Sequence, residues 1–145
     1  MIAVDTNVLL RYLLRDDIKQ ANKAKKLIEG FDKVLVVDAV LVETIWVLKG
    51  KRYKLTKQQI IDTILVLFTE ENIVFEDPYV VWSALKDYTL AQPIKVKGKV
   101  KLADFADALI INKSIKYGKT NGLDVLPFYT FDKAALLIDG TKEPK

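Results

Sequence analysis

The first ten residues, MIAVDTNVLL (residues 1–10), place a short apolar segment directly before an acidic residue and a helix-forming segment. Residues 2–4 are typical of a buried strand that ends at Asp5, and residues 7–14 have apolar side chains at helical spacing. The same order follows later, where the β-branched segment 34–37 precedes a predicted helix at 39–49. Repeated pairs of a strand and a helix predict an α/β fold with a mostly parallel sheet.

The rest of the chain continues this alternation. Gly118 stands just after a predicted helix, where a residue without a side chain is favoured. We predict one domain over residues 1–145, with a central mostly parallel sheet flanked by helices and the last few residues as a flexible tail. The further strands are expected at 73–75 and 125–131, and the further helices at 18–29, 60–68, 79–90 and 103–117.

Composition excludes several kinds of chemistry. The chain has no cysteine and no histidine, which rules out disulfides, thiolate ligands, Ser-His-Asp triads and histidine acid–base catalysis. No apolar run reaches the roughly 20 residues of a membrane span, and the N-terminus lacks the basic segment of a signal peptide. We therefore expect a cytoplasmic protein with no membrane partner. The net charge of +4 favours a polyanionic partner only weakly.

Four acidic residues stand beside apolar segments. Asp5 and Asp132 end the first and last predicted strands, and Glu43 and Asp107 interrupt apolar helical segments. We expect Glu43 to be buried, because apolar residues surround it on nearly every helical face. An ionised carboxylate is costly to bury unless it has a hydrogen bond, a cation or a metal ion as a partner.

A parallel sheet offers these four acids a common place. The ends of the first and last strands can be neighbours, and helices packed on them can point Glu43 and Asp107 into the same crevice. At a separation of about 6 Å and an effective dielectric constant of about 20, each pair of like charges would cost roughly 3 kcal/mol. Mg²⁺ or Mn²⁺ would relieve this repulsion, since both ions prefer carboxylate oxygens and also bind phosphates. Such an ion would also activate water for phosphodiester hydrolysis.

Each acid also has a simpler explanation when it is taken alone. Asp5 could cap the helix that follows it, and Asp132 could serve a turn or a helix cap. Glu43 could pair with a buried arginine or lysine, and Asp107 could be a satisfied helix acid. The occurrence of all four acids in one chain favours the metal site.

Four segments around these acids resemble the successive motifs of PIN domains: residues 4–10 (VDTNVLL), 42–43 (VE), 105–110 (FADALI) and 129–132 (YTFD). The resemblance covers essentially the whole chain and is strongest to VapC-type toxins. It implies a parallel α/β sheet and an endoribonuclease that uses Mg²⁺ or Mn²⁺ and leaves a 5′-phosphate. It also implies RNA as the substrate, a homodimer and, in the toxin branch, a cognate antitoxin that blocks the site.

Carried over residue by residue, the resemblance places Asp5, Glu43, Asp107 and Asp132 at the acidic positions of the family. It implies Asp5 and Asp107 as the principal metal ligands. Glu43 and Asp132 would hold the ion through water or orient the nucleophile. The residues expected to orient these carboxylates are Thr6, Asn7 and Thr130.

Asp104 raises a question of register. It precedes Asp107 by three residues, so both side chains share one helix face. The flanking apolar residues favour Asp107 as the family acid. We interpret Asp104 as a first-turn acid stabilised by the helix dipole, with a metal contact through water as the alternative.

Basic and aromatic residues are open to more than one interpretation. Residues 95–101 carry four alternating lysines, which we interpret as a solvated loop or a protected edge strand rather than an RNA-binding strip. The basic residues in 49–54 carry the same ambiguity. The helical spacing of Tyr12, Trp46 and Trp82 among apolar residues predicts core or dimer contacts.

Three other functions would use a similar pattern. A DNA nuclease or structure-specific nuclease would need the same carboxylates. A non-catalytic PIN-like RNA-binding module would have lost one of the acids, whereas all four positions are filled here. A phosphate-receiver domain would need a second acid beside Asp5, and the sequence has none there.

Overall fold

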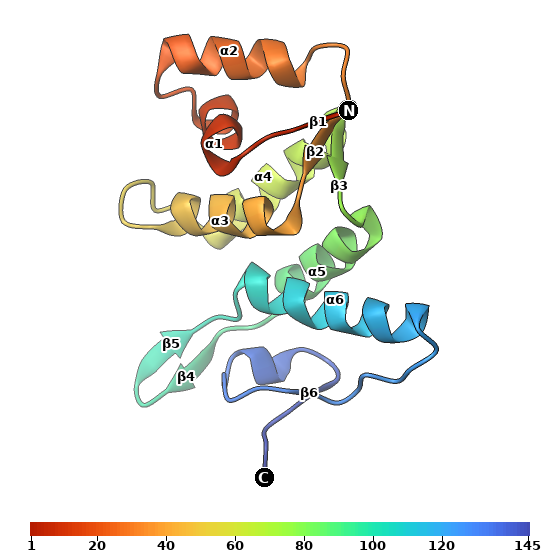
Figure 1. The fold of residues 1–145 in the computed structure, drawn as a ribbon. Coiled ribbons are helices and arrows are strands. Elements are labelled where there is room, and N and C mark those ends of the chain that lie inside the picture. Colours follow the sequence, from red (N-terminus) through yellow and green to blue (C-terminus); the bar gives the residue numbers. More distant parts are fainter. The chain divides into compact units, whose positions relative to one another are not determined.

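The parallel sheet expected from the sequence lies in the N-terminal part of the chain (Figure 1). The computed structural model describes residues 1–145, which form two compact units, unit 1 (residues 1–78) and unit 2 (residues 79–145). In unit 1 the strands are paired in the order β1 (Ile2–Ala3), β2 (Val34–Val36) and β3 (Ile73–Phe75). All pairs are parallel, which confirms the predicted α/β class.

Val34 lies at the centre of this sheet, opposite Ile2 on one side and Ile73 on the other. Its side chain and that of Val36 are fully buried. A middle strand of a parallel sheet is covered on both faces, which explains why β2 consists of β-branched and leucine residues without a polar alternation.

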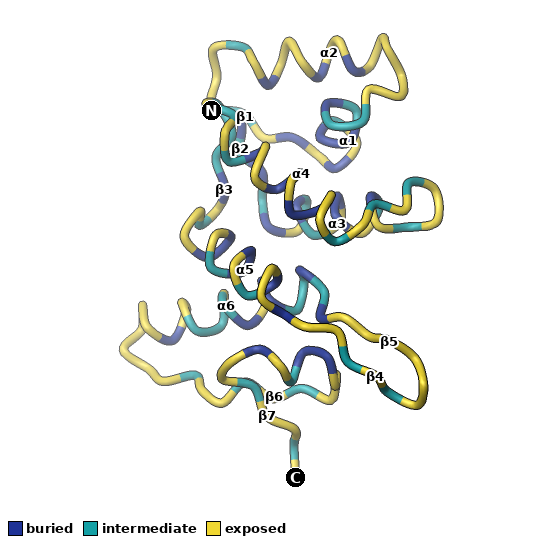
Figure 2. Tube along the Cα trace, turned by 180° about the vertical axis from the view of Figure 1, so that it is seen from behind, coloured by how far each residue is buried: buried dark blue, intermediate teal, exposed yellow.

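Four helices complete unit 1: α1 (Thr6–Leu14), α2 (Ile18–Ile28), α3 (Asp38–Lys49) and α4 (Lys57–Thr69). Helix α1 contacts α2 and α3, and α3 contacts α4. Figure 2 shows buried positions recurring along these helices and strands, as expected for helices that cover a sheet with one face. None of the helices in the structure has the length and apolar character needed to cross a bilayer.

Two helices and two small sheets make up most of unit 2. Helix α5 (Pro78–Leu90) begins at a proline, which suits the first position of a helix. In α6 (Phe105–Thr120), the Phe105 ring packs edge to face on Tyr88 of α5, with the centroids 6.0 Å apart. The remaining elements are the antiparallel pair β4 (Ile94–Val96) and β5 (Lys99–Lys101), the parallel pair β6 (Phe128–Tyr129) and β7 (Thr141–Lys142), and the 3₁₀ helix η1 (Ala135–Leu137).

The alternating lysines form a solvated antiparallel hairpin. Strand β4 pairs with β5 so that Lys95 lies opposite Val100. The two turn residues, Lys97 and Gly98, both have positive φ angles of 51° and 77°. Such angles are typical of the two-residue turns that match the twist of a hairpin. Residues 97–102 are all exposed (Figure 2).

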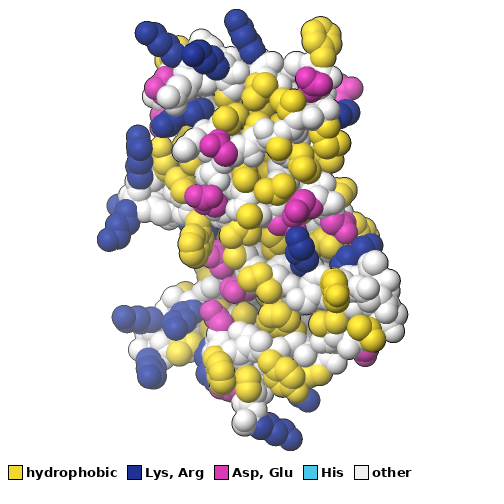
Figure 3. All heavy atoms as spheres, in the orientation of Figure 1, with side chains coloured by type: hydrophobic (Ala, Val, Ile, Leu, Met, Phe, Trp, Pro, Cys, Tyr) yellow, Lys and Arg dark blue, Asp and Glu magenta, His cyan; other side chains and the backbone are white.

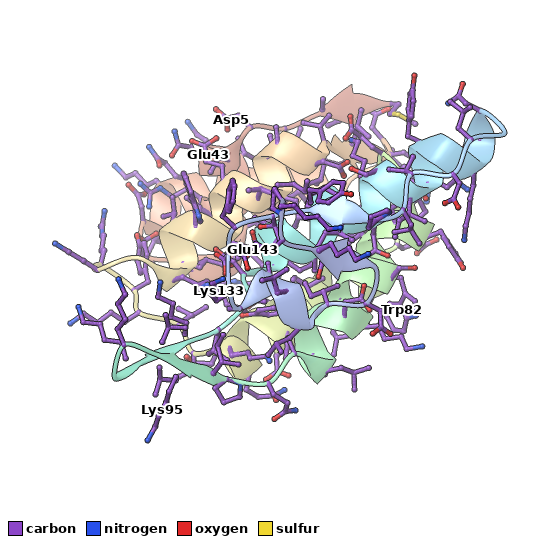
Figure 4. All side chains as sticks on the ribbon, turned by 90° about the horizontal axis from the view of Figure 1, so that it is seen from below. Asp5, Glu43, Trp82, Lys95, Lys133 and Glu143 are labelled. Atoms are coloured by element: carbon purple, nitrogen blue, oxygen red, sulfur yellow. The ribbon has the colours of Figure 1, made fainter.

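The prediction for the last strand is wrong in length and in partner. A strand was expected at 125–131 in the central sheet, but β6 covers only Phe128–Tyr129 and pairs with β7. Pro127 has no N–H to donate to a neighbouring strand, so regular pairing starts only after it. Beyond β7, Glu143 accepts an ion pair from Lys133 at 2.7 Å (Figure 4).

The predicted end of α6 is also wrong. Gly118 was expected after the helix, but α6 continues to Thr120, and Gly118 lies buried within it. A Cβ atom at this position would meet the Val125 side chain and would lie 2.7 Å from the Leu123 carbonyl oxygen. The glycine therefore permits a close approach of the following segment and does not serve as a helix terminator.

Candidate active site

Asp5 follows β1 directly and is the N-cap of α1. Its Oδ1 accepts a hydrogen bond from the Val8 N–H at 2.9 Å, and its backbone is extended, as N-cap residues usually are. The side chain is exposed, and no hydrogen bond engages its Oδ2. The capping explanation is therefore correct, and it leaves one carboxylate oxygen available to a ligand.

Glu43 is exposed on α3, so the prediction that it is buried is wrong. The buried residues of α3 include Leu41, Thr44, Ile45 and Leu48, which share one helix face. Glu43 lies outside this face. The helix is apolar on most sides, but only one side is covered within the structure, and the sequence pattern alone does not identify that side.

Thr6 links the two candidate site acids of unit 1, Asp5 and Glu43. Its side chain is only 8% exposed, and its Oγ1 donates a hydrogen bond of 2.8 Å to Glu43 Oε2. Because Thr6 is the residue after Asp5, this bond holds Glu43 close to the start of α1 (Figure 4). Thr6 thus contacts a predicted site carboxylate, and Glu43 Oε1 remains without a hydrogen bond.

In unit 2, Asp104 and Asp107 form a reciprocal cap at the N-terminus of α6. Asp104 is the N-cap, and its Oδ1 accepts a hydrogen bond from the Phe105 N–H at 2.8 Å. Asp107 Oδ2 accepts one from the Asp104 N–H at 2.9 Å. Both carboxylates are partly buried at the N-terminus of α6, where the helix dipole is positive.

Asp132 lies in the turn between β6 and η1. Its Oδ1 accepts hydrogen bonds from the N–H groups of Ala134 at 2.8 Å and Ala135 at 3.1 Å. Thr130 Oγ1 accepts a hydrogen bond of 3.0 Å from the Asp132 N–H, so this threonine contacts the backbone of Asp132 and not its carboxylate. Asp132 is exposed, and its Oδ2 is not engaged.

These acids offer the kind of donor set that a hard divalent cation prefers. Asp5, Glu43 and Asp132 each present one carboxylate oxygen without a hydrogen bond, while the other oxygen is held in place. Oxygen ligands of this kind suit Mg²⁺ and Mn²⁺. Within unit 1 and within unit 2, no group of three or more acidic side chains is arranged to hold a metal ion.

A second cluster in unit 1 surrounds Asp16. Asp16 forms an ion pair with Arg11 at 2.7 Å and accepts a hydrogen bond from the Tyr53 hydroxyl at 2.9 Å. The bonds from Arg11 and Tyr53 hold the pKa of the Asp16 carboxyl below its usual range. Arg11 also donates from Nε to Gln20 Oε1 at 2.7 Å. Arg11 of α1 therefore pairs with Asp16, and Glu43 accepts its hydrogen bond from Thr6 rather than from an arginine or a lysine.

A groove of about 470 Å³ opens beside Asp5, between α1 and α2. The sequence pattern does not predict this groove. The lining residues of α2 recur at the spacing of one helix face, which the sequence does show. The sequence does not show which other helix lies opposite this face. The groove is lined by Asp5, Asn7, Val8 and Arg11 on one side and by Gln20, Lys23, Ala24 and Leu27 on the other.

The aromatic residues divide into two kinds. Tyr12 is buried, as predicted for a core residue, and this burial raises the pKa of its hydroxyl well above the ordinary value of a tyrosine. Trp46 and Trp82 are 66% and 52% exposed, so the core interpretation is wrong for both. A role for them in dimer contacts stays a prediction.

The comparison with protein families gives a match over most of the chain. The PIN domain family model matches residues 2–133, a range that includes Asp5, Glu43, Asp107 and Asp132. Among solved structures, the chain is similar to the Mycobacterium tuberculosis toxin VapC20, described as cleaving the sarcin–ricin loop. The two are 13% identical over 85% of each chain, with a TM-score of 0.38. No curated protein matches the chain.

Proposed function

The chain belongs to the PIN domain family, and from this premise we propose that it is a metal-dependent endoribonuclease. One observation carries the proposal: the family match spans four motif positions, and all four hold a carboxylate. These are Asp5, Glu43, Asp107 and Asp132. Hydrogen bonds from nearby N–H or hydroxyl groups orient each of them, which supports a site that is preorganised for a cation.

In this proposal Asp5 and Asp107 are the principal ligands of Mg²⁺ or Mn²⁺. Glu43 and Asp132 hold water or orient the nucleophile, with Asp104 as a further candidate through water. Bound at these oxygens, the ion would lower the pKa of a water molecule and offset the charge on the phosphoryl oxygens. The water oxygen bonds to phosphorus, the bond to the 3′ oxygen breaks, and that oxygen takes a proton. The products are a 5′-phosphate and a 3′-hydroxyl.

The chain's own residues would keep the carboxylates in fixed orientations during this reaction. Thr6 holds one oxygen of Glu43, and the α1 backbone holds one oxygen of Asp5. The opposite oxygens then point away from these bonds. Less reorganisation is needed when a charged substrate arrives, which is how preorganised sites lower a barrier.

We further propose that the protein is the toxin of a toxin–antitoxin pair that acts on RNA as a homodimer. Support comes from the resemblance of residues 4–10 and 105–110 to the VapC-type motifs. We expect a short reading frame beside this gene. Its product should bind the chain and stop cleavage. A neighbourhood without such a frame would leave the nuclease proposal standing and remove the toxin assignment.

The test of activity compares labelled single-stranded RNA with DNA of matched sequence, in Mg²⁺, Mn²⁺ or chelator. It includes Asp107→Asn, because the amide oxygen can still accept the bond from the Asp104 N–H and preserve the cap. Asp139→Asn is the matched control, since it removes the same charge from an exposed acid of unit 2.

We expect metal-dependent RNA cleavage that Asp107→Asn abolishes and Asp139→Asn retains. Cleavage of DNA alone would favour the DNA nuclease. RNA binding without cleavage of either substrate would favour the non-catalytic module. Full activity of Asp107→Asn in a clean preparation would overturn the proposed site.

A further inference from the structure

We propose that the groove between α1 and α2 binds the nucleotide of single-stranded RNA next to the scissile phosphate. This inference rests on the proposed function, because it assigns the groove to the same substrate. The groove has Asp5 and Asn7 among its lining residues, so an RNA strand cut at Asp5 would pass directly into it. Its volume of about 470 Å³ is within the range of sites that hold small ligands.

The surface of the groove combines an apolar part with a few polar groups. Val8, Ala24 and Leu27 provide apolar contact for the face of a base and for the ribose. Such a mixture of apolar walls and sparse polar groups is typical of pockets that orient a ligand.

Two polar side chains in the groove are held in place before any ligand arrives. Arg11 is fixed by its ion pair with Asp16 and by its bond to Gln20 Oε1. Because the Gln20 oxygen is already engaged, the amide nitrogen of this groove-lining side chain is left as a donor. A fixed amide donor can hydrogen-bond the acceptors on the edge of an unstacked base, which is how single-stranded RNA is commonly recognised.

Helix α2 carries a row of three lysines, and the middle one, Lys23, lines the groove. Lys19, Lys23 and Lys26 follow the i, i+4, i+7 spacing of one helix side, and all three are exposed without an ion pair. Lys25 differs from them, because it pairs with Glu29 at 3.8 Å. Figure 3 shows Lys and Arg side chains gathered over α2. A row of free cations beside a nucleotide-sized groove matches a chain of phosphates.

The first experiment measures RNA binding by the full chain with Asp107→Asn in place, so that the RNA stays intact. A fluorescein-labelled single-stranded RNA of mixed sequence is titrated at several salt concentrations in Mg²⁺. Lys23→Ala is compared with Lys25→Ala, which makes the same change on a paired lysine two residues further along α2 and therefore on nearly the opposite side of the helix.

We expect Lys23→Ala to reduce the slope of log affinity against log salt by about 0.7, the value for one phosphate contact on a single strand. This change in slope corresponds to an affinity about fivefold lower than that of the parent at 0.1 M salt, if the two affinities are equal at 1 M salt. Lys25→Ala should leave both values unchanged. Equal effects of the two variants would overturn the proposal, because a diffuse positive field would then explain the binding.

The second experiment uses the absence of cysteine from the chain. Leu27→Cys creates a single thiol on the groove wall, where the parent side chain is 42% exposed, and Val66→Cys creates one on α4, where it is 46% exposed. Saturating RNA should slow maleimide labelling at position 27 and leave position 66 unaffected.

The outcomes separate this inference from the function on which it rests. If the parent protein cleaves RNA but RNA does not protect position 27, the groove assignment is wrong and the nuclease stands. If polyglutamate protects position 27 and RNA does not, the groove binds an acidic peptide instead. If the parent neither binds nor cleaves any RNA, both proposals are wrong.

Discussion

Substitutions at Asp5 separate its structural role from its proposed chemical role. Its Oδ1 caps α1 by accepting a bond from the Val8 N–H, and asparagine is about as good an N-cap as aspartate. Asp5→Asn should therefore change the free energy of unfolding by no more than about 0.5 kcal/mol, a range that allows for the lost charge at the helix N-terminus. Asp5→Ala removes the cap and should cost about 1 kcal/mol.

This difference is measurable as a shift in melting temperature. For a chain of this size, 1 kcal/mol corresponds to a decrease of about 2–4 °C in the Tm. Both variants should lose RNA cleavage by at least about 100-fold, because residues that merely support a metal ligand already contribute about 10–100-fold. Stability and activity should thus separate in Asp5→Asn and fall together in Asp5→Ala.

The assay pairs thermal denaturation, followed by circular dichroism, with RNA cleavage at saturating Mg²⁺. Asp17→Asn is the matched control, because Asp17 caps α2 in the same way through the Gln20 N–H at 3.0 Å and has no proposed chemical role. It should keep both stability and activity. Cleavage by Asp5→Asn within twofold of the parent would refute the assignment of Asp5 as a ligand.

Three further predictions follow from named contacts. Thr6→Val removes the hydrogen bond to Glu43 and should lower kcat about 10–100-fold in steady-state RNA cleavage. Thr6→Ser keeps the hydroxyl and should keep the parent kcat. Equal kcat values for the two variants would count against a positioning role for Thr6. The lowered pKa of Asp16 adds stability that is complete above its unfolded pKa of about 3.9 and is lost as the pH falls through the folded pKa. The urea concentration at the unfolding midpoint should therefore fall less between pH 7 and pH 2 in Asp16→Asn than in the parent. An equal fall in both proteins would contradict this. Gly118→Ala should destabilise by about 1–3 kcal/mol despite the higher helix propensity of alanine, since the new methyl meets Val125 and a carbonyl oxygen; a higher Tm would show that the segment yields easily.

Features that depend on a few neighbouring residues agreed well between sequence and structure. The strand at Ile73–Phe75 has the predicted bounds, and α2 begins at the predicted residue. The capping role considered for Asp5 is also present. Caps, strand residues and helix spacing act within one or two turns of the chain, so the local pattern contains the information that determines them.

Features that depend on which surfaces meet were decided only by the tertiary structure. The apolar pattern of α3 predicted burial of Glu43. However, only one side of the helix is covered by other elements, and Glu43 lies on an exposed side. The local pattern predicts a helix end at Gly118, because it contains no sign of the close approach of Val125.

By itself, the sequence determined the α/β class, the order of the elements and the four acidic positions that carry the family motifs. The tertiary structure decided that Thr6 would hold Glu43, that Arg11 would pair with Asp16, and that α1 and α2 would enclose a groove beside Asp5. The physical reason is that backbone preferences and capping bonds are short in range. A contact between side chains 37 residues apart, such as that of Thr6 with Glu43, exists only once packing has brought their helices together.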